Sequence, residues 1–124
     1  MKKRVNFKIT KEGVITPDTL YKEDILLHYF LVDKDYFALE QIENLEKFAK
    51  GELIWSEHTK HESFGFAQGD AYVEIIEDNV HLIAFPPSLV SKYPTVIIPI
   101  KELIKLMKSW YKFQVMHGVD PKIL

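Results

Sequence analysis

The residues of this chain that could do chemistry are mainly histidines and carboxylates, because its 124 residues include five histidines and no cysteine. His58 and His61 lie three positions apart, between Glu57 and Glu62. On a helix, that spacing could place two imidazoles on one metal ion. The surrounding residues are typical of a strand and a polar loop, and the sequence fixes no third neutral ligand. We therefore expect no metal site in this segment.

The remaining histidines and the serines give little support for catalysis. His28, His81 and His117 are isolated from one another in the sequence, whereas a general base needs a positioned partner and a nucleophile or water. None of the serines lies in the Gly-x-Ser-x-Gly context of a nucleophile elbow. Residues 65–69 lack the lysine and the glycine spacing of a phosphate-binding loop. We expect no catalytic residue and no cofactor.

The carboxylates form a more informative pattern, because they are concentrated in the middle of the chain. The net charge is −2, but residues 23–90 carry −10 and each flanking segment, 1–22 and 91–124, carries +4. Such asymmetry indicates what a partner would be rather than what the fold is. The plainer interpretation is that acidic and basic segments face each other in the fold and largely neutralise.

The stretch 70–113 contains the elements that must position these carboxylates. Residues 72–76 alternate with a period of two, which predicts a strand with one face on a core. Residues 77–79 predict a short polar turn, in which Asn79 tolerates a positive φ better than most residues. Residues 80–85 continue as a second, more apolar strand.

A long helix is expected to follow. Ile98-Pro99-Ile100 opens it with proline at a first-turn position, where the missing N–H costs nothing, and Gly118 ends the pattern. Its apolar face is formed by Ile100, Leu103, Ile104, Met107, Trp110 and Tyr111. A basic stripe runs along the same helix and consists of Lys101, Lys105, Lys108 and Lys112. We interpret the stripe as a solvated face rather than a nucleic-acid interface, because the chain is acidic overall.

The first third of the chain is less regular. Alternation over residues 5–9 predicts a half-buried strand, and Thr16-Pro17-Asp18 is typical of a turn or loop. The continuous apolar run 25–32 fits either a short helix over about residues 22–29 or a buried strand, and periodicity alone does not separate the two.

Helical spacing predicts a further helix over residues 36–50, with Asp33 or Asp35 as its N-cap and Gly51 as its C-terminal cap. A strand is then predicted to begin at Leu53 and to run to about His58. The order of elements predicts an α+β fold, with an antiparallel sheet of four or five strands and two main helices packed on one face.

We expect a single domain over residues 1–124, with a loose tail at 118–124. The first residues include no apolar run of the kind found in secretory signals, and no segment approaches the about 20 apolar residues of a membrane span. A cytoplasmic location is therefore the expectation.

The predicted strand 72–76 carries the surface best suited to a partner. If Val73 and Ile75 point inward, the outward side chains make a face that is acidic, aromatic and apolar together. The alternative is that a second helix covers this face. Strand pairing would bring further carboxylates to the same side, so the candidate partner-binding residues are Glu52, Glu57, Asp70, Tyr72, Glu74, Glu77 and Asp78.

Over roughly residues 36–113, the order of features resembles small bacterial immunity proteins that accompany polymorphic toxins, including those of contact-dependent growth inhibition. The features that carry the resemblance are a helix ending at Gly51, Trp55, Gly69-Asp70, the turn 77–79, the strand 80–83, and the helix ending Trp110-Tyr111-Lys112-Phe113. The resemblance implies a non-enzymatic protein that neutralises a cognate toxin, often a nuclease, by binding it. Such proteins diverge most at the binding surface, so it assigns no binding residue here.

The expected function is therefore that of a protein-binding domain with a basic protein partner, and we expect neither nucleic acid nor membrane as a ligand. Two alternatives stay open. One is a small enzyme or ligand-binding domain that uses His58, His61 or His81 with nearby carboxylates. The other is a homodimeric accessory protein whose outward strand face pairs with itself, since the sequence leaves the oligomeric state open.

Overall fold

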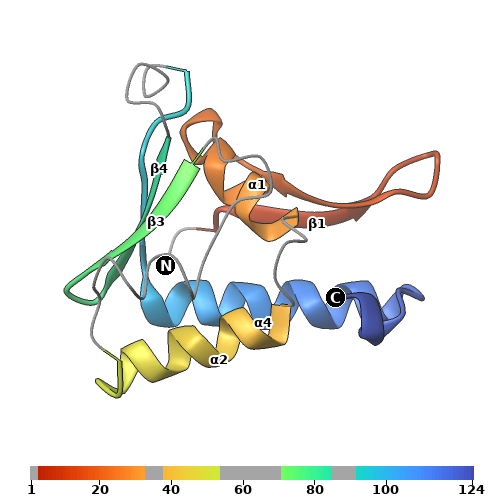
Figure 1. Ribbon diagram of the computed structural model, residues 1–124. Coiled ribbons are helices and arrows are strands. Elements are labelled where there is room, and N and C mark those ends of the chain that lie inside the picture. The colour runs from red at the N-terminus through yellow and green to blue at the C-terminus, as the bar shows by residue number, and fades with distance from the viewer. Residues whose placement is uncertain (1–2, 33–37, 54–70, 85–91) are drawn as a thin grey trace.

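The computed structural model describes residues 3–32, 38–53, 71–84 and 92–124. In these ranges the elements are β1 (Val5–Ile9), β2 (Ile15–Thr19), the 3-10 helix η1 (Lys22–Asp24), α1 (Ile25–Val32), α2 (Ala38–Ala49), β3 (Ala71–Ile76), β4 (Asn79–Ala84), β5 (Val96–Pro99), α4 (Ile100–Met116) and the 3-10 helix η3 (Pro121–Ile123). The described strands form two antiparallel sheets, β1–β2 and β3–β4–β5 (Figure 1). The α+β class is confirmed, whereas a single sheet of four or five strands is not.

The β1–β2 hairpin corrects the interpretation of Thr16-Pro17-Asp18 as a turn or loop, because these residues are part of β2. Proline usually interrupts a sheet, since it has no N–H to donate. Here Pro17 faces Phe7. In an antiparallel pair, hydrogen-bonded and non-hydrogen-bonded residue pairs alternate. Backbone hydrogen bonds join Leu20 to Arg4 and Thr10 to Val14, so Phe7 and Pro17 form a non-hydrogen-bonded pair and the Pro17 nitrogen points away from β1. No ladder bond is lost, and the Pro17 carbonyl accepts a hydrogen bond from His28 Nδ1 (2.8 Å).

The three-stranded sheet contains the second correction. Val96–Pro99 forms β5, a strand that the sequence analysis missed, and it pairs with β4. Pro99 therefore lies at the N-cap of α4 and not in its first turn. The turn between β3 and β4 is confirmed, but the positive φ (55°) falls on Glu77 and not on Asn79. The Ile100 N–H donates to the Asp78 carbonyl (2.9 Å), which ties this turn to the start of α4.

The helices mostly follow the predicted pattern. Residues 25–32 form α1, so the helical alternative holds for the apolar run. Helix α2 lies within the predicted range 36–50 and is followed by Gly51 with a φ of 78°. The N-cap candidates Asp33 and Asp35 and the predicted strand 53–58, apart from Leu53, lie outside the described residues.

Helix α4 is the element against which much of the rest packs. It contacts α2 along one side and both β4 and β5 near its start. Toward its other end, the Trp110 ring lies 5.2 Å from the Phe7 ring of β1, and its Nε1–H donates to the Leu31 carbonyl of α1 (3.1 Å). The buried side chains of α4 are Ile100, Leu103, Ile104, Met107 and Trp110, as predicted, while Tyr111 is half-buried.

Arg4 joins the two sheets through its guanidinium. Nη2 donates to the carbonyl of Ile97 in β5 (3.1 Å), and Nη1 lies 3.4 Å from Oδ1 of Asp24, which is buried. Nε lies 3.8 Å from Oε1 of Glu102 in α4. One side chain therefore connects β1 to η1, β5 and α4.

We expect Arg4→Met to lower the free energy of unfolding by about 2 kcal/mol, because it removes charge-assisted hydrogen bonds at a partly buried site. Chemical denaturation measures the change. The matched control is Lys8→Met, which removes the same charge from β1 but breaks an exposed ion pair with Asp18, worth at most about 1 kcal/mol. An Arg4 variant no less stable than the Lys8 variant would contradict the assignment.

A pH dependence follows from the Lys8–Asp18 pair. The Asp18 carboxylate accepts a hydrogen bond from the Lys8 ammonium, which holds the pKa of the Asp18 carboxyl below its ordinary value of 3.8. A carboxyl with a lowered folded-state pKa stabilises the fold above its unfolded-state pKa, and this contribution is lost as the pH falls through the folded-state value. We expect Lys8→Met to raise the Asp18 pKa in an NMR titration and to weaken the loss of stability below about pH 4. An unchanged Asp18 titration would exclude this pair as the cause.

Candidate functional site

The two faces of the β3–β4–β5 sheet differ sharply in burial. The inner face is formed by Val73, Ile75, Val80, Leu82, Ala84, Val96 and Ile98, and all of these side chains are buried. The contacts of α4 and α1 with β4 belong to the core that these residues form. The inward orientation of Val73 and Ile75 is therefore confirmed, and Tyr72, Glu74 and Ile76 share the opposite face.

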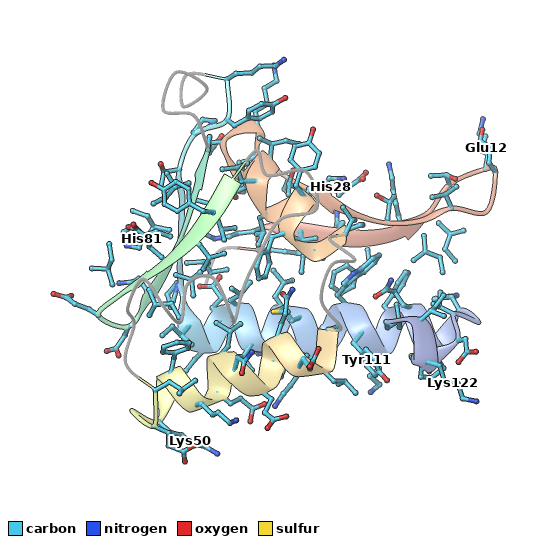
Figure 2. All side chains as sticks on the ribbon, viewed as in Figure 1. Glu12, His28, Lys50, His81, Tyr111 and Lys122 are labelled. Carbon is cyan, nitrogen blue, oxygen red and sulfur yellow. The ribbon has the colours of Figure 1, made fainter. Side chains whose placement is uncertain are left out.

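The strand register defines what lies on that opposite face. We call it the outer face, and it consists of Tyr72, Glu74, Ile76, Asn79, His81, Ile83, Ile97 and Pro99. Its three rows are Tyr72–Ile83, Glu74–His81–Ile97 and Ile76–Asn79–Pro99. Figure 2 shows His81 on the side of the sheet away from α1. No described helix covers this face, on which Ile76 and Ile97 are 47% and 49% exposed.

The outer face and the adjoining turn carry carboxylates but no lysine or arginine. Glu74 is half-buried on the outer face, and Glu77 and Asp78 are exposed in the turn at its end. Over the described residues, none of these three carboxylates makes a side-chain hydrogen bond or an ion pair. The outer face contains no lysine or arginine, and the Arg4 guanidinium is engaged with Asp24, Glu102 and the Ile97 carbonyl. The surface is therefore suited to a cationic partner.

The structure brings together four of the seven predicted site residues: Tyr72, Glu74, Glu77 and Asp78. Glu52 is exposed beyond the end of α2, where its N–H donates to the Lys47 carbonyl (2.9 Å), and it is not part of the sheet. Glu57 and Asp70 lie outside the described residues, as do His58 and His61.

Sequence reasoning did not assemble the outer face beyond Tyr72, Glu74 and Ile76 of β3. His81 faces Glu74 directly, and Ile97 faces His81 from β5. The alternation of His81 with Ile83 places both on one face of the sheet, but the pairing of His81 with Glu74 depends on the register of the hairpin. Ile97 could not be placed, because β5 was interpreted as the start of a helix.

The other candidate residues are scattered. His28 binds the Pro17 carbonyl, and the His117 ring packs 4.4 Å from the Phe113 ring at the end of α4. Among the described residues, no three histidine or acidic side chains are grouped so that they could hold a metal ion. The four lysines of the basic stripe are exposed, and Lys108 pairs with Glu46 of α2 (3.2 Å).

None of the described helices is both long and apolar enough to span a membrane. Comparison of the chain with protein-family models, with curated proteins and with solved structures finds no match. The geometry of the outer face is therefore the main basis for a functional proposal.

Glu77 combines exposure with backbone strain, since a residue with a Cβ rarely adopts a positive φ. We expect Glu77→Gly to raise the free energy of unfolding by about 0.5 to 1 kcal/mol, because glycine adopts this conformation without strain. Chemical denaturation of the full chain measures the change. Asp78→Gly is the matched control, since Asp78 has no positive φ, and it should destabilise the fold slightly. Destabilisation by Glu77→Gly would show that its side chain contributes more to the fold than the strain costs.

Proposed function

We propose that this chain is a non-enzymatic protein-binding domain that uses the outer face and the adjoining turn to bind a basic protein. The observation that carries the proposal is the mixture on one open sheet face. Exposed isoleucines and a tyrosine surround a carboxylate that has no counter-ion in the described structure. Apolar and aromatic side chains are typical of the centre of an interface, and uncompensated charge is typical of complementarity to a partner.

The two kinds of residue would have different roles in binding. Glu77 and Asp78 are exposed in the turn and would act at long range, raising the association rate with a cationic surface. Tyr72, Ile76 and Ile97 would lose exposed surface in the complex and slow its dissociation. The rigid support of this surface comes from the buried inner face of the same strands.

The most specific form of the proposal is an immunity protein that blocks a toxin domain. The order of features along the chain resembles such proteins, and an acidic surface is suited to cover the basic active site of a nuclease. A cytoplasmic location belongs to the same proposal. A homodimer through the outer face is less favoured, because a two-fold contact centred on Glu74 would bring two carboxylates together.

The test uses charge reversal on a captured partner. We expect the full chain to retain a protein from the source cells at low salt, and Glu74→Lys to weaken the purified complex at least tenfold, which is about 1.4 kcal/mol. The control is Lys105→Glu, because Lys105 is exposed on α4 with no ion pair among the described residues. It should change the affinity less than twofold.

Three outcomes would overturn the proposal. One is the absence of any retained protein, and another is a loss of affinity with Lys105→Glu but not with Glu74→Lys, which would place the contact on the basic stripe. The third is a dimer in sedimentation at micromolar concentration that Glu74→Lys disrupts, which would show that the outer face binds a second copy of this chain. Protection of cells from the partner's toxicity would test the immunity role separately.

A further inference from the structure

Building on the proposed function, we infer that the outer face is specific for arginine: the partner places a guanidinium against the Glu74 carboxylate and the Tyr72 ring. Lysine would be a poorer ligand at this position. The inference concerns the chemistry of the contact, and it depends on what surrounds Glu74 in the sheet.

The neighbours of Glu74 on β3 and across β4 include no lysine or arginine. Tyr72 and Ile76 lie two residues away on the same strand, about 7 Å along it. His81 faces Glu74 across β4, and the diagonal neighbours are Ile83 and Asn79. Glu74 is half-buried within this surround of aromatic, aliphatic, amide and imidazole side chains, whereas Glu77 and Asp78 of the turn are exposed.

This surround discriminates between the two cationic side chains. A guanidinium is planar and weakly hydrated, so it can stack on an aromatic ring while it donates two parallel hydrogen bonds to one carboxylate. An ammonium is strongly hydrated and would lose more of its hydration among Ile76, Ile83 and the Tyr72 ring. Tyr72 and Glu74 lie two residues apart on one face of β3, so one guanidinium could contact both side chains.

The chain's own arginine cannot occupy this position, because the Arg4 guanidinium is fixed at β5 and α4 by Ile97 and Glu102. Glu77 and Asp78 would attract any cation, since both are exposed, and they add affinity without selecting arginine. Selectivity between arginine and lysine therefore isolates the contribution of Glu74 and Tyr72.

The test uses defined peptides, so it does not require the partner to be known. The full-length 15N-labelled chain is titrated with acetyl-Gly-Arg-Ile-Arg-Gly-amide and with its lysine counterpart of equal charge. We expect the arginine peptide to shift the amide resonances of residues 72–76 and 81–83 and to bind at least about threefold more tightly than the lysine peptide.

The variants separate this contact from general attraction. Glu74→Gln and Tyr72→Leu should each abolish the arginine preference. Glu40→Gln, which removes the same charge from an exposed position on α2, should retain it. Dispersed amide spectra of each variant establish that it is folded.

Equal affinity for the two peptides, or an arginine preference that survives Glu74→Gln, would overturn the inference. The inference and the proposed function fail separately. If a partner binds the outer face with equal affinity after its contacting arginine is changed to lysine, the arginine site is excluded but the protein-binding role is not. If the chain selects arginine peptides but retains no protein partner, the protein-binding role is excluded but the arginine site is not.

Discussion

No backbone ladder joins the described strands of one sheet to those of the other, so the two sheets are connected through the shared hydrophobic core and through the side chain of Arg4. Arg4 directly precedes β1, and its guanidinium contacts the edge of β5, the carboxylate of the buried Asp24 and Glu102 on α4. A guanidinium suits this role, since it offers several donors in a fixed plane. The Trp110 ring provides a second connection further along α4, to β1 and α1.

These connections also determine which surface is left for a partner. The inner face of β3–β4–β5 is filled by the core, and the Ile97 carbonyl on the outward edge of β5 already accepts from Arg4. An edge strand with unpaired carbonyls can recruit other chains, and the guanidinium blunts that edge. Of the three-stranded sheet's surfaces formed by described residues, the outer face is the one that combines open apolar side chains with uncompensated carboxylates.

The parts of the fold that follow from local pattern could be predicted from the sequence, namely the period-two alternation at Val73 and Ile75, the helical spacing of α2 and α4, and the cap at Gly51. Both proline errors come from local rules, which assign Pro17 to a turn and Pro99 to the first turn of a helix. Both residues are tolerated in strands because register and strand end leave their nitrogens without a ladder bond to make. The pairing of Glu74 with His81 and Ile97 also depends on register, which no single segment specifies.

Two local costs occur on the same hairpin. Glu77 has a positive φ where glycine or asparagine would fit with less strain, and the carboxylate of the half-buried residue Glu74 makes no ion pair among the described residues. Sequences usually resolve such conflicts locally, so their persistence is expected mainly where function requires them. A stability explanation accounts for neither residue, because glycine would relieve the first and glutamine would remove the charge of the second. The proposed cationic partner would account for both, since it would need negative charge at the turn and an unpaired carboxylate on the face that the same hairpin presents.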